Sequence, residues 1–369
     1  MRSRIAVDLL WLVPGDVGGS EEYAVRTLLA HARHGSSDVR PVVFLSEVAA
    51  DAHPELGRAI DLEVRPLDNR RRGRRLAAEA TWLAPRVRRL DAVHHVGGRI
   101  PMRTGRPVAV TVHDLQPLDH PEHFSVVKRA YLGRALPRSV RRADVVVTVS
   151  DAVGDEVVRR FALDRTRVVT VSAGVRSVAP LPAMPDRPPT VLYPAVTHPH
   201  KRHDLLIRAF EHLADDHPTV RLALTGGVGR AEDEVRRLAA ASRHADRIDR
   251  PGRVPAAELA ARMASAAVVA FPSAYEGFGL PVLEAMAAGV PALVADGTPA
   301  ADLVGPAARV ETGAGAAEWA RRLGIVLDDE GVRRNLALDG LDRASAHGCE
   351  ATAETLDRAW RLLLGGRIS

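Results

Sequence analysis

The sequence is poor in cysteine and contains no long apolar segment. Cys349 is its only cysteine, so no disulfide can form within the chain, and a reducing compartment is allowed. No apolar run approaches the roughly 20 residues that a membrane-spanning helix needs. The N-terminal stretch M-R-S-R-I-A-V-D-L-L-W-L-V-P weakly resembles a signal peptide, but a glycine-rich turn and an amphipathic helix follow it directly. We therefore interpret it as a first strand, and we expect a cytoplasmic protein.

Lysine is almost as scarce, and arginine carries the positive charge. Lys128 and Lys201 are the only lysines among 51 basic residues, against 46 acidic ones. Residues 1–178 have a net charge of +8, and residues 179–369 have a net charge of −3. Any attraction to an acidic surface is therefore expected in the N-terminal half.

The length and the pattern of elements predict two α/β domains. A chain of 369 residues is long for one core. Short apolar strands alternate with helical segments, and the alternation restarts after residues 176–189, which contain five prolines. This pattern predicts two Rossmann-like, doubly wound parallel-sheet domains that face each other across a cleft, with helices at the C-terminus. We place the domains at 1–178 and 190–348, a Pro-rich linker at 179–189, and a helix that crosses back to the first domain at 349–369.

Apolar segments mark the expected strands, and the ligand site is expected in the cleft between the domains. The strands expected in the first half are Ile5–Leu12, Pro41–Leu45, Leu62–Pro66, Ala92–Val96, Pro107–Val112, Asp144–Val149 and Val168–Val171. Those expected in the second half are Val191–Pro194, Val220–Thr225, a strand at Ile248, and Val268–Phe271.

An arginine-rich segment, Asn69–Leu90, contains R-R-R-G-R-R and R-V-R-R with Trp82 and Leu83 between them. A solvated helix is one explanation of this pattern. Contact with an anionic membrane surface or with a phosphorylated acceptor is another. Nucleic acid is not expected, because no aromatic interleaving or recognised binding motif accompanies the charge.

Two strand ends in the first half carry candidate site residues. The segment V-P-G-D-V-G-G-S predicts a strand, a glycine loop and a helix capped by Ser20, and a helix start of this kind favours anions. It lacks the G-x-G-x-x-G pattern, so a dinucleotide site is not favoured, and a tight turn explains it equally well. His113 and Asp114 follow the strand Pro107–Val112, at the edge where open α/β sheets bind ligands. His120 and other polar residues follow, but their spacing matches no common metal-ligand pattern.

The most informative stretch is Ser273–Gly289, S-A-Y-E-G-F-G-L-P-V-L-E-A-M-A-A-G. An apolar strand precedes it, and Pro281 suits the first position of the helix that follows. The free N–H groups of that helix start can bind a phosphate. Glu276 and Glu284 flank this site, and a nucleotide sugar is both anionic and rich in hydroxyl groups.

Together these motifs resemble glycosyltransferase family 4, a family of retaining enzymes with the two-domain GT-B fold. Its hallmark is an E-x7-E motif in the context E-G-F-G-L-P-x-L-E-A-M-A-x-G, which Glu276 to Glu284 reproduces. The resemblance extends through T-V-H-D-L-Q-P-L-D-H-P-E-H-F-S, R-R-A-D-V-V-V-T-V-S and T-H-P-H-K-R-H-D-L-L-I-R-A-F, and it covers nearly the whole chain. It implies a mannosyltransferase-like enzyme that moves a hexose from a nucleoside-diphosphate sugar to a hydroxyl acceptor, with the acceptor on the side of residues 1–178.

The resemblance also implies roles for individual residues. Glu284 would hold the donor ribose, Glu276 the transferred sugar, and Lys201 the diphosphate. The other donor-binding residues would be Gly18, Gly19, Arg202, Gly226, Arg253, Val254, Gly277, Phe278, Gly279 and Leu280. His113 would join Glu276 and Lys201 as a catalytic residue. His113, Asp114 and His120 would lie on the acceptor side.

The sequence departs from the family pattern in two places. His200 precedes Lys201 where the family often has arginine, and Ala301-Asp302-Leu303 stands where many relatives have Pro-Glu-Val. The first departure leaves open which cation assists Lys201. The second leaves the roof of the base pocket open.

The chemistry implied by the resemblance needs no resident cofactor. A lysine and a helix N-terminus can stabilise the departing diphosphate, so we expect no essential metal. No side-chain nucleophile is evident, which favours front-side attack with retention. The expected partners are a donor such as GDP-mannose, a UDP-hexose or a dTDP-hexose, and a glycan, lipid-linked or small-molecule acceptor. Peripheral contact with an anionic membrane, at the inner membrane face, is also expected. Two alternatives stay open: another GT-B enzyme such as a nucleotide-sugar epimerase, and a non-catalytic nucleotide-sugar-binding partner.

Overall fold

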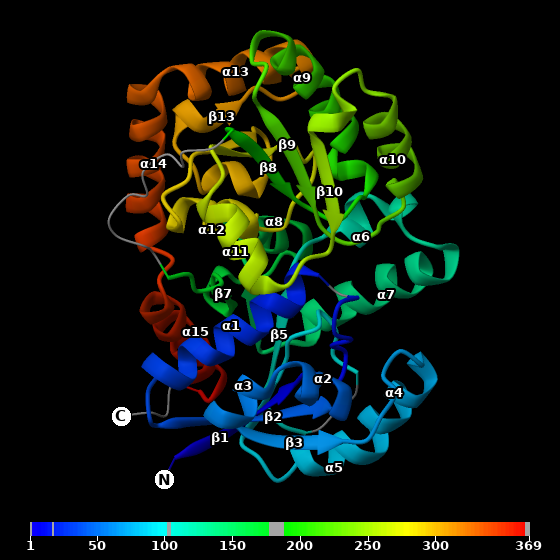
Figure 1. The fold of residues 1–369 in the computed structure, drawn as a ribbon. Coiled ribbons are helices and arrows are strands. Elements are labelled where there is room, and N and C mark those ends of the chain that lie inside the picture. The colour runs from blue at the N-terminus through cyan, green and yellow to red at the C-terminus, as the bar shows by residue number, and fades with distance from the viewer. Residues whose placement is uncertain (1, 17, 102–104, 177–187, 366–369) are drawn as a thin grey trace. The chain divides into compact units, whose positions relative to one another are not determined.

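The computed structural model describes residues 2–16, 18–101, 105–176 and 188–365 (Figure 1). The chain forms two compact units, one of Met1–Gly174 with Cys349–Ser369 and one of Val175–Gly348. Most of the expected linker at 179–189 lies outside the described residues. No helix in the described ranges is long and apolar enough to cross a bilayer.

Unit 1 is built on a parallel sheet of seven strands in the order β3-β2-β1-β4-β5-β6-β7. Its strands are β1 Ser3–Asp8, β2 Val39–Ser46, β3 Asp61–Arg65, β4 Ala92–His95, β5 Val108–Val112, β6 Val145–Thr148 and β7 Val168–Thr170. Its helices are α1 Gly19–His34, α2 Glu47–Ala52, α3 Pro54–Ala59, α4 Arg72–Ala78, α5 Ala84–Val87, α6 Gln116–Asp119, α7 Val126–Arg142, α8 Asp151–Phe161 and α15 Cys349–Leu363. A π-helical segment, Glu79–Leu83, joins α4 to α5 without a break.

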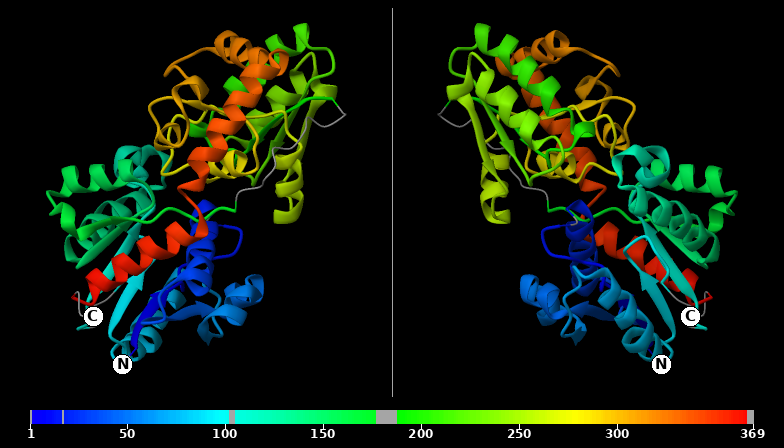
Figure 2. Two further views of the ribbon diagram at one scale, coloured as in Figure 1. Left: turned by 90° about the vertical axis from the view of Figure 1, so that its left-hand side faces the viewer. Right: turned by 90° about the vertical axis from the view of Figure 1, so that its right-hand side faces the viewer.

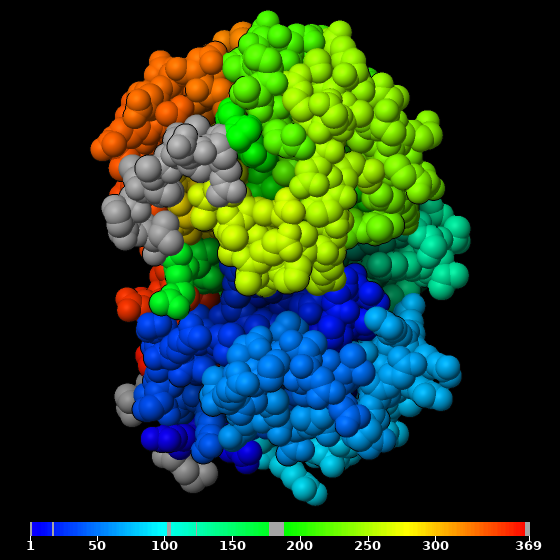
Figure 3. All heavy atoms as spheres, viewed as in Figure 1, coloured from blue at the N-terminus to red at the C-terminus, as the bar shows by residue number. Residues whose placement is uncertain are grey.

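Unit 2 is built on a parallel sheet of six strands in the order β10-β9-β8-β11-β12-β13. Its strands are β8 Thr190–Pro194, β9 Arg221–Thr225, β10 Ile248–Gly252, β11 Val268–Phe271, β12 Ala292–Ala295 and β13 Arg309–Val310. Its helices are α9 His203–Asp216, α10 Glu232–Ala241, α11 Ala256–Ala264, α12 Leu280–Ala287, α13 Ala316–Asp328 and α14 Glu330–Ser345. Figure 3 shows α10 and α11 (yellow-green) on the surface of this unit. The α/β fold of two Rossmann-like, parallel-sheet domains is confirmed.

The middle strands β5 and β11 are almost entirely apolar, and Thr111 of β5 is the one polar residue in them. All four residues of β11 and all five of β5 are buried. Such continuous runs of Val, Ala and Phe are typical of strands in the middle of a parallel sheet. They fix the carboxyl ends of the strands, from which the site loops leave.

Several expected strand ends are shifted by one or two residues, and three element boundaries were wrong for identifiable reasons. The strand β1 ends at Asp8, because the Asp8 carboxylate accepts the N–H of Leu10 at 3.0 Å and turns the chain. The helix α1 is capped by Gly18, whose φ of +60° few other residues adopt, and not by Ser20. The third concerns Lys201, because the pattern after the Pro-rich linker predicts a helix over Lys201–Asp215. It lies in a 3-10 turn, and Arg202, with a φ of +54°, separates that turn from α9.

The helix α15 packs against α1 within unit 1, and the two lie side by side in both views of Figure 2 (red and blue). Trp360 is fully buried and donates from Nε1 to Nδ1 of His94 at 3.2 Å. The Nε2 atom of His31 lies 2.9 Å from a carboxylate oxygen of Asp357. The last described helix therefore completes the core of the unit that begins the chain.

Candidate functional site

The site in unit 2 forms where the strand order of the sheet reverses. The chain adds β9 and β10 on one side of β8 and then returns to place β11 on its other side. Loops that leave the carboxyl ends of β8 and β11 consequently lie next to each other, which is where open α/β sheets bind ligands. The β8 loop carries Lys201, and the β11 loop carries Glu276.

Lys201 and Glu276 form an ion pair at this edge. The Nζ atom of Lys201 lies 2.5 Å from Oε1 of Glu276, and the two side chains are 17% and 10% exposed. Nζ also lies 5.7 Å from the centre of the Phe271 ring. A cation and an anion are therefore held together at a site that is largely shielded from water, where an electrostatic interaction is stronger than at the surface.

Tyr193, at the end of β8, fixes the two loops to each other. Its hydroxyl donates a hydrogen bond to the Lys201 carbonyl at 2.7 Å. The same hydroxyl accepts a hydrogen bond from the hydroxyl of Ser273 at 2.9 Å. Burial and the nearby Glu276 charge raise the pKa of Tyr193 well above its usual value, so it stays a neutral donor. The N–H of Ala274 adds a second link, because it donates to the His200 carbonyl at 2.8 Å.

His203 lies beneath this pair and is neutral. Its ring packs on Tyr193 with centres 4.8 Å apart and is 2% exposed. Burial, together with the Lys201 charge, lowers the pKa of His203 to about 4. The adjacent Ala195 backbone opposes this shift, but neither ring nitrogen has a partner at hydrogen-bonding geometry among the described residues. A charged His203 would repel Lys201, so its neutrality maintains the site.

Two glycines let the loops approach closely. Gly279 caps α12 with a φ of +96°, and a Cβ there would meet the Cβ of Ala300 at 2.5 Å. A Cβ on Gly226 would meet the Ala195 carbonyl oxygen at 2.2 Å. Neither position accepts a larger residue without a backbone shift. The Gly226 N–H also donates to Gly252 at 2.9 Å and so joins the β9 loop to the end of β10.

Some of the other predicted donor residues lie at the same edge of the sheet. Gly277, Phe278 and Leu280 continue the β11 loop into α12, in which Leu280 is the first residue and Pro281 the second. Glu284 is half-buried in α12. Phe278 is buried, and its ring lies 5.9 Å from that of His347.

Arg202, Arg253 and Val254 are less closely tied to this edge. Arg202 is 43% exposed and lies 3.3 Å from Asp204, at the start of α9. Arg253 and Val254 follow β10, two strands away from β8.

The site residues predicted in the N-terminal half all lie in unit 1. His113 directly follows β5, and its Nε2 lies 2.8 Å from the Val96 carbonyl oxygen. A carbonyl only accepts, so Nε2 carries the proton and Nδ1 keeps a lone pair. The ring packs against Tyr23, 5.1 Å between centres, and burial lowers the pKa of His113 to about 4. His113 is therefore a neutral acceptor at Nδ1 near neutral pH.

Gly18, Gly19, Asp114 and His120 lie around the same edge of the unit 1 sheet. Gly18 and Gly19 are exposed at the start of α1. Asp114 accepts the N–H of Gln116 at 3.0 Å, and His120 lies 3.2 Å from Glu122 on the surface.

A buried polar cluster at this edge was missed by the sequence analysis. Asp8 and His95 end the adjacent strands β1 and β4, where the unit 1 strand order reverses, and their side chains lie 2.8 Å apart. Glu79 is 2% exposed and pairs with Arg99. Burial raises the pKa of Glu79, and the nearby Asp8 charge adds to the shift. The sequence does show that each of these two apolar strands ends in a polar residue. The two residues become neighbours only through the order of the strands in the sheet, which the sequence pattern does not give.

Comparisons with known proteins identify the chain. A model described as Glycosyltransferase Family 4 matches residues 17–177, and one described as Glycosyl transferases group 1 matches residues 182–340. The chain belongs to the family 4 and group 1 glycosyltransferases. Within the described ranges of this glycosyltransferase, no group of three or more His, Cys, Asp or Glu side chains could hold a metal ion.

Named relatives of this glycosyltransferase act on sugars. O-antigen chain mannosyltransferase B of Escherichia coli is 29% identical over 278 residues, which is 72% of each chain. D-inositol 3-phosphate glycosyltransferase of Streptomyces avermitilis is 27% identical over 385 residues, covering 92% of this chain and 82% of the relative.

Solved structures share the fold. Anabaena HepE in complex with UDP and glucose matches 97% of this chain and 99% of its own, with a TM-score of 0.75 and 19% identity. Sucrose-phosphate synthase of Thermosynechococcus elongatus matches 99% and 100%, with a TM-score of 0.72 and 20% identity. At these identities the likeness concerns the fold alone.

Proposed function

We propose that this glycosyltransferase is a retaining hexosyltransferase that moves a hexose from a nucleoside-diphosphate sugar to a hydroxyl acceptor. The observation that carries the proposal is the Lys201–Glu276 pair of 2.5 Å beside the glycine loop that starts α12. The names of the mannosyltransferase relatives and the UDP-bound structural neighbour support GDP-mannose, a UDP-hexose or a dTDP-hexose as the donor.

The donor-binding residues would act through charge and fixed backbone donors. The diphosphate would take Lys201 away from Glu276, and the freed carboxylate would accept hydrogen bonds from the transferred sugar. The N–H groups of Phe278, Gly279 and Leu280 and the start of α12 would stabilise the departing diphosphate. Glu284 would hold the ribose. The other donor contacts would come from Gly18, Gly19, Arg202, Gly226, Arg253, Val254 and Gly277.

The acceptor would react from unit 1 by front-side attack, with its proton passing to the departing phosphate oxygen. His113 would take part in the reaction through its neutral Nδ1, and Asp114 and His120 would contact the acceptor. The positive charge that stabilises the leaving group comes from Lys201, so catalysis needs no metal in this proposal. We place the enzyme in the cytoplasm, with peripheral contact to the anionic inner membrane face through the arginine-rich segment 70–89.

A thermal-shift screen of nucleotide sugars tests the donor site. The matching donor should raise the melting temperature of the wild type, because a ligand that binds only the folded state stabilises it. Glu284→Ala should reduce that rise, and Glu234→Ala, an exposed acid in the first turn of α10, should leave it unchanged. If none of the nucleoside-diphosphate sugars shifts the wild type, the donor-site assignment fails. Product analysis with the best donor then establishes the linkage.

A further inference from the structure

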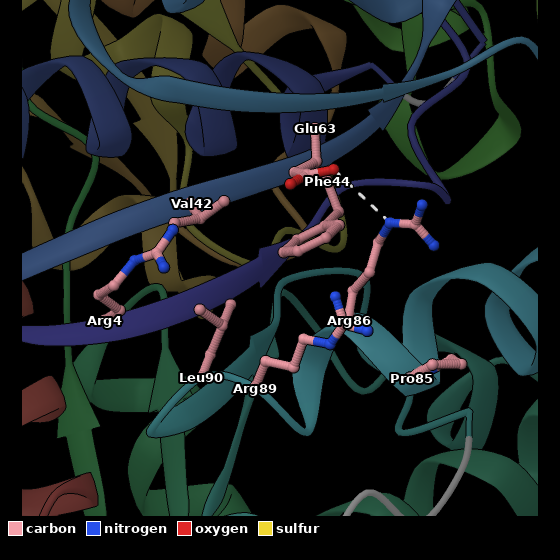
Figure 4. Close-up of a pocket in the computed structure, with 8 residues that line it drawn as sticks. All are labelled: Arg4, Val42, Phe44, Glu63, Pro85, Arg86, Arg89 and Leu90. Carbon is pink, nitrogen blue, oxygen red and sulfur yellow. Dashed lines mark ion pairs between the residues drawn. The ribbon is translucent and has the colours of Figure 1, made fainter.

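Unit 1 contains a cavity of about 370 Å³ away from the site loops. It lies between the face of β1–β3 and the end of α5, and its lining includes Arg4, Arg86, Arg89 and Glu63 around Phe44 and Leu90 (Figure 4). Its size is in the range of small-molecule sites. The proposed sugar transfer uses none of these residues, although Arg86 and Arg89 belong to the segment 70–89 that we propose contacts the membrane.

The charge of the lining is strongly positive. Three arginines face one acid, Glu63, which lies 3.6 Å from Nε of Arg86 (dashed in Figure 4). Within the described chain, the guanidinium groups of Arg4 and Arg89 have no ion-pair or hydrogen-bond partner. Two arginines thus remain uncompensated at one concave site, and each can donate two parallel hydrogen bonds to an anion.

The base of the cavity is apolar. Phe44 is 1% exposed and Leu90 5% exposed, and the Phe44 ring lies between the arginines in Figure 4. Arg4 and Arg89 are themselves exposed, so their guanidinium groups are accessible to an anion that rests on this apolar base. A phosphate ester has both the charge for the arginines and an organic part for the apolar base.

The cavity is separate from the carboxyl edge of the sheet. Arg4 lies four residues before Asp8 on β1, about 13 Å along a strand. Trp82, one helical turn after Glu79 and one turn before Arg86, is buried and packs on Phe44 with ring centres 5.6 Å apart. A ligand here would not reach the strand ends where His113 lies.

We propose that this arginine-lined cavity binds the phosphate group of a phosphate ester, at a second site independent of sugar transfer. The ester is either a free small molecule or the headgroup of an anionic lipid, because both present the same phosphate to the same arginines.

Binding measurements on matched variants test this proposal. The double variant Arg4→Gln/Arg89→Gln removes the two uncompensated charges, and neither side chain supports a partner whose loss would unfold the protein. The control Arg58→Gln/Arg88→Gln removes the same charge from exposed positions of unit 1 outside the lining. Calorimetric titration with glycerol 3-phosphate probes the free ester. Sedimentation with phosphatidylcholine vesicles, with and without phosphatidylglycerol, probes the headgroup.

The outcomes distinguish a free phosphate ester from a lipid headgroup, and they show whether the proposal fails. We expect the wild type and the control to bind one probe alike, and Arg4→Gln/Arg89→Gln to bind it about tenfold more weakly, as for the loss of a charged hydrogen bond. If Arg4→Gln/Arg89→Gln binds glycerol 3-phosphate more weakly, the ligand is a free ester. If it loses binding only to anionic vesicles, the ligand is a lipid headgroup. If binding is weakened equally in both double variants, the effect comes from general charge and the proposal is overturned. Absence of binding by the wild type would also overturn it. Neither readout involves sugar transfer, so failure of the proposed donor site would leave this test unaffected.

Discussion

At the scale of single residues, the ion pair of Lys201 and Glu276 has opposite effects on the two halves of the proposed donor. In the proposed function, Glu276 would compete with the diphosphate for Lys201, and its carboxylate would bind the transferred sugar. The two side chains are 17% and 10% exposed, so the competition takes place with little screening by water. The pair should therefore lower the affinity for a nucleoside diphosphate that carries no sugar.

Glu276→Gln should separate these effects. We expect tighter binding of the nucleoside diphosphate, by about three- to tenfold, because the competing charge is gone, and a loss of kcat of at least about 100-fold. Calorimetry and steady-state kinetics with the best donor measure the two quantities. In Lys201→Met/Glu276→Gln the gain in affinity should vanish. Weaker diphosphate binding in Glu276→Gln alone would contradict the competition.

His203 should make unit 2 sensitive to acid. Its folded pKa of about 4 lies below the usual 6.5, so between these values the unfolded chain binds a proton that the folded chain does not. The free energy of unfolding therefore falls as the pH drops from 6.5 to 4, by up to about 3 kcal/mol. His203→Phe keeps a ring against Tyr193 and removes the titration, so its unfolding free energy should depend less on pH in this window.

His53→Gln serves as the control of opposite sign. The hydrogen bond to Glu21 raises the pKa of His53, so His53 stabilises the fold at low pH and loses this effect as the pH rises through its folded pKa. Its removal should steepen the loss on acidification. Urea unfolding at pH 7.5 and pH 5 compares the variants, and identical pH dependence in His203→Phe and the wild type would contradict the role of His203.

The sequence offers candidate site residues, but it predicts only some of the contacts that the structure gives them. The helix start beside Glu276 follows from local patterns of glycine and proline. Tyr193 and Ser273, which fix the two loops to each other, are separated by 80 residues, and nothing local marks them as a pair. The sequence analysis missed the pair Asp8 and His95 for the same reason, because the two residues become neighbours only through the order of the strands in the sheet.

At the scale of elements, α12 depends on the conformation of Gly279. Gly279→Ala should destabilise unit 2 by about 2–4 kcal/mol, because it adds a steric clash with Ala300 to an unfavourable positive φ. Gly313→Ala is the matched control. It has a φ of +83° with no atom near the added Cβ, so it carries the backbone cost alone, about 1 kcal/mol.

Chemical denaturation measures both glycine variants, and donor-induced thermal shifts report on the loop. We expect Gly279→Ala also to lose most of the shift, whereas Gly313→Ala should keep it. Equal destabilisation by the two substitutions would show that contact with Ala300 contributes nothing.

Element types were easier to predict than element boundaries. Apolar runs such as Val268–Phe271 were located correctly, because a buried central strand tolerates little else. The ends of β1 and the start of α9 depend on a side-chain hydrogen bond of Asp8 and on the left-handed conformation of Arg202. Neither is visible in hydrophobic periodicity.

At the scale of the whole molecule, each unit has its own sheet and core, so each should unfold in its own transition. Asp357 on α15 lies 2.9 Å from His31 and accepts the Ser36 N–H at 2.6 Å. Asp357→Ala should lower the unit 1 transition by the equivalent of about 2–3 kcal/mol and leave the unit 2 transition in place. Glu354→Ala, at an exposed position of the same helix, should change neither.

Scanning calorimetry resolves these transitions. Gly279→Ala should lower the unit 2 transition, whereas Asp357→Ala should lower the unit 1 transition. If both variants shift the same single transition, the units unfold together and the assignment of two independent cores is wrong.

The position of α15 in the chain has a consequence for protein synthesis. Unit 2 is inserted, in sequence, between the two parts of unit 1. On the ribosome, unit 2 can finish folding before α15 has been made, while the face of α1 that α15 covers stays open to water and to chaperones. A premature stop just before Cys349 would thus release a chain in which unit 2 can be folded while the face of α1 that α15 covers stays exposed.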